Sequence, residues 1–102
     1  ENRPQEALTC ARAARDLFQQ LDDRDRELAA QAHIVNACLR MGDPHEAVRE
    51  AQDCVDTCRK DADWKHMALA MKELASVHLA SKAPELCRQV ASRARALFRE
   101  EG

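Results

Sequence analysis

Cysteine and histidine are the residue types in this chain that could support covalent or metal chemistry. Cys54 and Cys58 are four positions apart, a spacing that puts both thiols on one face of a helix, where they could bind one metal ion. A zinc site needs two further ligands, and no second closely spaced pair is evident. The pattern favours the alternative that the cysteines are small buried hydrophobic residues of a reduced, cytoplasmic protein. All five fall within helical patterns: Cys10, Cys38, Cys54, Cys58 and Cys87.

The histidines do not belong to a recognisable catalytic pattern. A cysteine–histidine nucleophile needs a third orienting group and an oxyanion site, and nothing in the sequence indicates either. The sequence also lacks a glycine-rich phosphate loop, a G-x-S-x-G motif and an H-E-x-x-H motif. We expect His78 to be a half-buried packing residue and His45 to be exposed. The sequence therefore predicts a protein that is not an enzyme and uses no metal or other cofactor.

The charges exclude two classes of partner. The net charge is −2, and 16 basic and 18 acidic residues are interspersed along the chain. This is not the basic surface of a nucleic-acid-binding protein, and there is no polybasic cluster of the kind that binds membrane surfaces. No apolar run approaches the roughly 20 residues that span a bilayer. We therefore expect neither a nucleic acid nor a membrane as partner, and we interpret the charged run at 22–27 as a solvated loop.

The elements that position these residues repeat along the chain. Two glycines and three prolines among 102 residues, with abundant alanine, leucine, arginine and glutamate, predict an all-α protein. The prolines recur every 40 residues, at Pro4, Pro44 and Pro84. A shift of 40 also aligns a block of mostly small residues: Ala7 with Ala47 and Cys87, Ala11 with Ala51 and Ala91, Ala14 with Cys54 and Ala94, and Phe18 with Cys58 and Phe98. This block indicates a true internal repeat.

Each period contains two helices joined by short turns, so that neighbouring helices run antiparallel. Asp23, Asp43 and Asp63 are expected to be N-caps, and Glu46 stands where it could complete a capping box. Gly42 marks a helix end, and Lys82 at the equivalent position predicts a looser turn. The five predicted helices are 4–21, 25–41, 44–60, 64–81 and 84–101.

Two stretches of this pattern, 29–58 and 68–98, resemble tetratricopeptide repeats. In that family, a large aliphatic and a small residue are followed by a larger side chain, a turn glycine and regularly spaced alanines. The first copy follows this order with Ile34-Val35, Cys38, Gly42, Ala47, Ala51 and Cys54, and the second with Leu74-Ala75, His78, Lys82, Cys87, Ala91 and Ala94. The 40-residue period is similar to the long repeats of kinesin light chain and spindle-orientation adaptors, although the usual aromatic residues are mostly replaced.

The resemblance implies an α-α superhelix, a solenoid of antiparallel helix pairs, with five helices in a single domain over 1–102. In this register 4–21 is a leading helix, 25–60 is repeat one and 64–101 is repeat two. The chain reads as part of a longer array. Both terminal helices should then expose a face that a neighbour would cover, so either end-to-end self-association or marginal stability is expected.

The function that the resemblance implies is a non-catalytic scaffold or adaptor for protein–protein interaction, which binds a peptide or a partner helix on its concave face. The first helix of each repeat lines that face in the family. The residues expected there are His33, Asn36, Arg40, Lys72, Glu73 and Ser76. Asn36 and Lys72 are similar to the family's clamp for a carboxyl terminus, but Ser76 replaces an asparagine, so we do not expect that ligand. The alternative for these six residues is that they are ordinary solvent-exposed polar positions. The alternatives for the whole domain are a structural spacer in a long array and a ligand-sensing regulatory domain of a larger protein.

Overall fold

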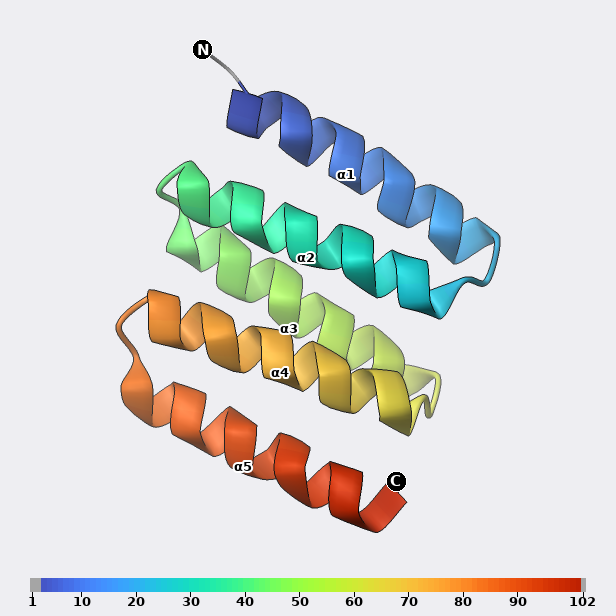
Figure 1. The fold of residues 1–102 in the computed structure, drawn as a ribbon, viewed down its shortest axis with the longest axis vertical. Coiled ribbons are helices and arrows are strands. Elements are labelled where there is room, and N and C mark those ends of the chain that lie inside the picture. Colours follow the sequence, from blue (N-terminus) through green and yellow to red (C-terminus); the bar gives the residue numbers. More distant parts are fainter. Residues whose placement is uncertain (1–2, 102) are drawn as a thin grey trace. The chain divides into compact units, whose positions relative to one another are not determined.

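The computed structural model describes residues 3–101, which form helices joined by short turns (Figure 1). The helices are α1 (Arg3–Gln20), α2 (Arg24–Arg40), α3 (Pro44–Lys60), α4 (Trp64–Ala80) and α5 (Pro84–Glu101). No strand occurs in this part of the chain. The prediction of an all-α, repeat-like fold with five helices is confirmed, and each predicted boundary lies within one residue of the observed one.

The same turn follows each of the first four helices. One residue adopts a left-handed backbone, and the N–H of the next residue donates to a carbonyl of the last helical turn, which is the hydrogen bond of a Schellman motif. The left-handed residues are Asp22, Gly42, Ala62 and Lys82, with φ of 59°, 76°, 53° and 60°. The turn thus recurs every 20 residues, at half the period that the prolines indicate.

Lys82 does not loosen its turn. Its backbone N–H donates to the carbonyl oxygen of Leu79 at 3.1 Å, and the N–H of Ala83 donates to that of His78 at 2.8 Å. The corresponding hydrogen bonds around Gly42 are 3.0 Å long, so the two turns have the same geometry. The expectation of a looser turn was wrong because lysine occupies the left-handed conformation that glycine adopts more readily.

The predicted N-caps are confirmed. The carboxylates of Asp23, Asp43 and Asp63 each accept from the backbone N–H three residues later, at 3.2, 3.1 and 3.3 Å. The capping box at Glu46 does not form. The N–H that Glu46 would bind belongs to Asp43 and already donates to the carbonyl oxygen of Cys38, and the Glu46 carboxylate is held by arginine side chains.

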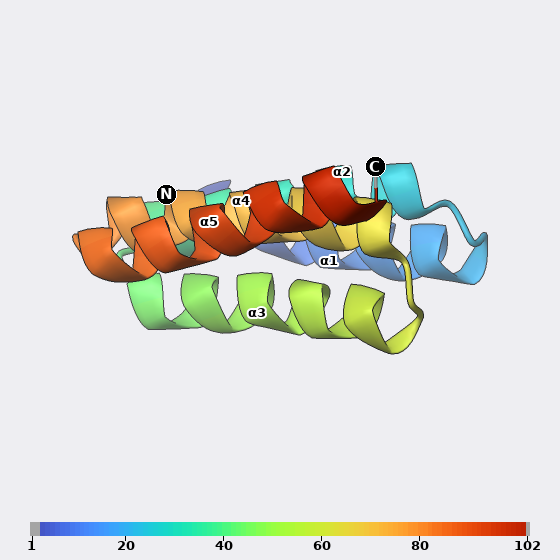
Figure 2. The same ribbon diagram turned by 90° about the horizontal axis from the view of Figure 1, so that it is seen from below.

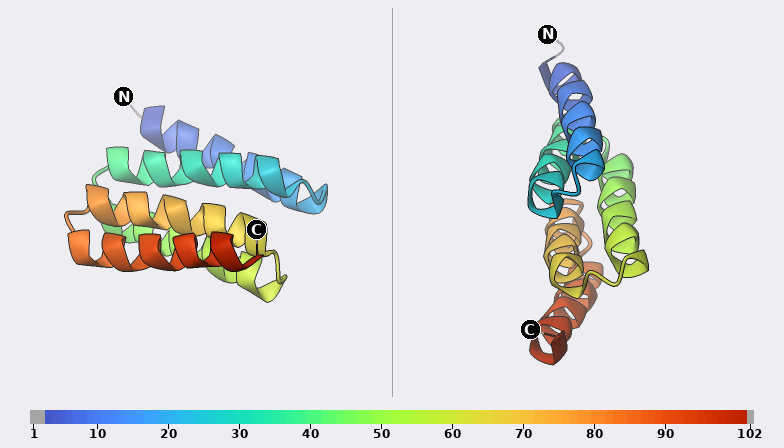
Figure 3. Two further views of the ribbon diagram at one scale, coloured as in Figure 1. Left: turned by 60° about the horizontal axis from the view of Figure 1, so that its bottom comes forward. Right: turned by 90° about the vertical axis from the view of Figure 1, so that its right-hand side faces the viewer.

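The chain forms two compact units, Glu1–Glu50 and Ala51–Gly102, and the boundary between them in the sequence falls within α3. In the first unit, α1 packs antiparallel to α2 (Figures 1 and 3). In the second unit, α4 packs antiparallel to α5, as Figure 2 shows from another side. The antiparallel pairing that the short turns predict is therefore present in each unit, while the assignment of 1–102 to a single domain stays a prediction.

Small and aliphatic side chains form the core of each unit. The largest completely buried side chains are Ile34, Val35, Val55, Val77, Cys38 and Cys58. His45 is exposed, as predicted, whereas His78 is buried rather than half-buried. The prediction for the cysteines needs a correction, because Cys10 is exposed and only Cys38 and Cys58 are fully buried. Within residues 3–101, every helix is too short or too polar to cross a membrane.

Candidate functional site

The three site residues predicted on α2 form one exposed row. His33, Asn36 and Arg40 are all exposed, and their spacings of three and four positions place them along one face of the helix. The intervening residues Ile34, Val35, Ala37 and Cys38 face the interior. This row belongs to the first unit, and its side chains are available to a partner.

The three residues predicted on α4 differ in their exposure. Lys72 and Ser76 are exposed and lie one helical turn apart, whereas Glu73 is half-buried. Burial raises the pKa of the Glu73 carboxyl above its usual value, and the positive charge of Lys72 opposes part of that rise. The α4 residues belong to the second unit, whereas the α2 row belongs to the first.

A groove that the sequence analysis did not identify runs between α1 and α2. Its volume is about 430 Å³, and its lining is mostly apolar. Residues of α1 form one wall and residues of α2 the other: Ala7, Cys10, Ala11, Ala14 and Phe18 from α1, and Arg26, Ala29, Ala30 and His33 from α2. His33 is thus the one predicted site residue that also lines the groove.

The α1 wall of the groove is the repeated block of small residues. Ala11 is buried at the floor, while Ala7 is exposed and Phe18 is half-buried. The equivalent positions in α3 behave differently, since Ala47 and Cys58 are both 0% exposed. The same block is therefore covered in α3 and open in α1. The 40-residue repeat is the sequence feature that points to this groove, because it pairs the α1 residues of the block with α3 residues that are mostly buried.

The α2 wall of the groove carries the guanidinium of Arg26 and the imidazole of His33, and no acidic residue is among those that line the groove. Arg26 and His33 lie seven positions apart on α2, two turns along the same face. The Nε atom of Arg26 lies 3.6 Å from a carboxylate oxygen of Asp23, but 72% of the Arg26 side chain is exposed. The rest of the lining is apolar, so the electrostatic character of the groove depends on these two residues.

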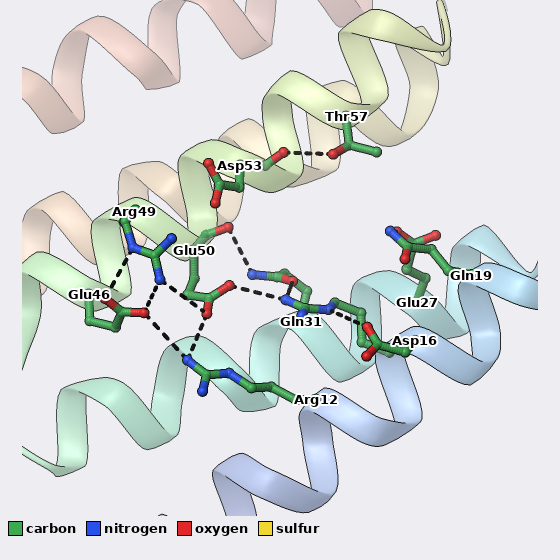
Figure 4. A network of polar contacts seen from close by, with 11 residues as sticks. Arg12, Asp16, Gln19, Glu27, Gln31, Glu46, Arg49, Glu50, Asp53 and Thr57 are labelled. Carbon is green, nitrogen blue, oxygen red and sulfur yellow. Dashed lines mark hydrogen bonds and ion pairs between the residues drawn. The ribbon is translucent and has the colours of Figure 1, made fainter.

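A cluster of ion pairs centred on Glu50 fixes α1 in the first unit (Figure 4). Nη2 of Arg12 and Nη1 of Arg15 donate to the two carboxylate oxygens of Glu50, at 2.9 and 3.1 Å. Only 7% of the Glu50 side chain is exposed. Charge-assisted hydrogen bonds to both oxygens offset the cost of burying this carboxylate. They connect the side of α1 that carries Arg12 and Arg15 to the start of α3.

Gln31 extends the cluster to α2. Its Nε2 donates to the backbone carbonyl oxygen of Glu50 at 2.9 Å, and its Oε1 accepts from Nη1 of Arg15 at 3.2 Å. At the rim, hydrogen bonding to Arg49 holds the pKa of the Glu46 carboxyl below its usual value. Burial, reinforced by the negative charge of Glu50, raises the pKa of the Cys38 thiol. Because Glu50 of α3 is bound by Arg12 and Arg15 of α1 and by Gln31 of α2, the cluster holds both walls of the groove in place.

The side chains that could bind a metal ion do not assemble into a site in the described part of the chain. Across residues 3–101, no group of three or more histidine, cysteine, aspartate or glutamate side chains is placed to hold a metal ion. Of the cysteine pair on α3, Cys58 is buried and Cys54 is half-buried. Both positions belong to the repeated block, in agreement with a packing role.

Comparison with protein-family models, with curated proteins and with solved structures finds no match to this chain. The resemblance to tetratricopeptide repeats therefore stays a prediction from the residues at 29–58 and 68–98. The structure itself establishes an all-helical, repeat-like chain with an apolar groove between its first two helices.

Proposed function

We propose that this chain is a non-catalytic protein–protein interaction module of the tetratricopeptide-like kind, and that it binds a helical segment of a partner protein in the α1/α2 groove. The observation that carries the proposal is the open, mostly apolar groove of about 430 Å³. Ligand sites in proteins are typically concave, apolar and edged by a few polar groups, and this groove has each property.

The dimensions of the groove suit a short helix. Its α1 wall runs from Ala7 to Phe18, a span of roughly 16 Å at a rise of about 1.5 Å per residue, or about three turns. The alanines on both walls let a third helix approach closely, because small side chains keep helix axes near one another. In α3 the equivalent alanines Ala47 and Ala51 are completely or almost completely buried, which supports the capacity of this block to accept a tightly packed neighbour.

The exposed row on α2 adds polar recognition beside the groove. His33 lines the groove, and Asn36 and Arg40 continue the row away from it. An amide and a guanidinium can bind backbone or carboxylate groups of a segment that extends beyond the groove. The role of Lys72, Glu73 and Ser76 on α4 remains a prediction from the resemblance.

The test uses a fluorescent designed peptide that forms an amphipathic helix, with leucine and alanine on one face and serine and glutamine on the other. Its binding is followed by fluorescence anisotropy and by protection of the exposed Cys10 thiol from alkylation. Ala7→Phe fills the groove, and Ala13→Phe is the matched control on an exposed position of α1 outside it. We expect at least a tenfold loss of affinity for Ala7→Phe and no change for Ala13→Phe.

Equal affinities for the two phenylalanine variants would show that the groove is not the binding site. Charge reversal at Arg40 and Lys72 tests the predicted polar rows in the same assay. If neither reversal changes binding of peptides that carry terminal or side-chain carboxylates, the rows have no part in recognition. A chain that binds none of these peptides is better described as a structural spacer.

A further inference from the structure

We infer that the partner helix of the α1/α2 groove is acidic: it presents aliphatic side chains to the groove and carries aspartate or glutamate along the edge that meets Arg26 and His33. This inference rests on the proposed function and specifies the chemistry of the ligand. It follows from the charges and the side-chain sizes of the lining.

The sizes of the lining residues determine what the partner presents. Five of the nine lining residues are alanines, and Phe18 is the only large apolar side chain among them. A groove formed by small side chains has space for larger ones from the opposite helix, since packed interiors leave few voids. The partner should therefore place leucine or isoleucine at positions i, i+4 and i+7, which form one stripe along a helix.

The charges of the lining determine the edge of the partner. Arg26 is the one ionised side chain in the lining, His33 is the one other titratable nitrogen group, and no carboxylate is present. The Asp23 carboxylate accepts from the backbone N–H of Arg26 at 3.2 Å and lies 3.6 Å from Nε of its guanidinium. A guanidinium has five N–H donors in a planar fork, so Arg26 can bind a second carboxylate through its remaining groups. An acidic edge on the partner is complementary to this wall, and a basic edge is repelled.

A second copy of this chain is a less suitable occupant. In the second unit, α4 exposes the apolar side chains of Trp64, Leu69 and Leu79, and α5 exposes those of Leu86 and Phe98. The α4 helix carries two lysines against one glutamate. The α5 helix carries four arginines against three glutamates, so each helix brings excess positive charge to the α2 wall and its guanidinium. Electrostatic complementarity therefore favours an acidic helix from another protein over self-association through α4 or α5.

Two designed helices test the inference. They share one leucine-bearing face and differ only in the edge, which is glutamate in one and lysine in the other. Each is titrated into the wild-type chain, into Arg26→Glu and into the neutral variant Arg26→Gln. Lys65→Glu, on an exposed position of the second unit, is the control with the same change in net charge as Arg26→Glu. Circular dichroism verifies that each variant is folded.

At low ionic strength we expect the acidic helix to bind the wild type about tenfold more tightly than the basic one, with the difference reduced by salt. The preference should disappear in Arg26→Gln, reverse in Arg26→Glu and persist in Lys65→Glu. Equal binding of both helices to the wild type would overturn the acidic partner while leaving the groove as a docking site. If neither helix binds or protects Cys10, the proposed function fails as well. Dimerisation that Ala7→Phe abolishes would replace the acidic partner with a second copy.

Discussion

The four turns permit a direct test of how much free energy their left-handed residues cost. Gly42 adopts this backbone at φ 76°, and Ala62 adopts it at φ 53° in an equivalent turn. Gly42→Ala and Ala62→Gly are therefore opposite substitutions in matching environments. The first should destabilise its unit, and the second should stabilise its own.

The expected magnitude follows from the backbone alone. Apart from atoms of Gly42 itself and of its two chain neighbours, a β-carbon added at Gly42 has no heavy atom within 4 Å, so Gly42→Ala introduces no steric clash with the rest of the protein. A left-handed backbone costs an L-residue about 1–2 kcal/mol, and the greater freedom of unfolded glycine opposes this by roughly 0.5–1 kcal/mol. We therefore expect Gly42→Ala to lower the free energy of unfolding by about 0.5–1 kcal/mol. Ala62→Gly should raise it by a similar amount.

Thermal and urea unfolding, followed by far-ultraviolet circular dichroism, measure both effects. A change of this size corresponds to a shift of roughly 2–8 °C in the midpoint for a domain of this length. Ala13→Gly, on an exposed position within α1, is the control, and it should destabilise by about 1 kcal/mol because glycine is a poor helix former. A stabilising or neutral Gly42→Ala, or a destabilising Ala62→Gly, would refute the assignment of backbone strain to these turns.

The remaining predictions concern single side chains. Glu50→Ala should lower the free energy of unfolding by about 3 kcal/mol, because it leaves partly buried arginines without their carboxylate. Arg12→Ala should lower it by less, because the Arg12 side chain is more exposed. If urea unfolding shows a loss below about 1 kcal/mol for Glu50→Ala, the cluster has no structural role. Glu73→Gln should stabilise the chain at pH 7, because burial raises the pKa of Glu73 and so penalises its charged form. That penalty is complete above the raised pKa and vanishes below the usual value of 4.5, so the two proteins should converge in stability as the pH falls through that range. In alkylation followed by mass spectrometry at neutral pH, Cys10 should react first and Cys38 among the last, since Cys10 is exposed and burial raises the pKa of the Cys38 thiol; early modification of Cys38 would show that the first unit opens readily.

The sequence by itself determined the local structure of this protein. The helix bounds depend on interactions among residues close together in the chain, and so do the caps at Asp23, Asp43 and Asp63. The 40-residue period is visible in the sequence itself. Aspartate before a helix accepts from the first backbone N–H groups, and proline at the first position supplies a backbone angle that suits the helix. Both therefore predict a helix start without knowledge of the rest of the fold. For the same reason the exposure of His33, Asn36 and Arg40 on α2 follows from their spacing along the helix.

Only the tertiary structure decided which of the repeated positions are covered. Ala7 and Ala47 have the same residue type and the same place in the repeat, yet one is exposed and the other completely buried. Burial depends on the neighbours that a helix acquires in space, and these are absent from a local pattern. The partners of Glu50, which lie 35 and 38 residues away at Arg15 and Arg12, are set in the same way. The groove and the cluster that holds its walls are therefore properties of packing, whereas the helices that form them are properties of the sequence.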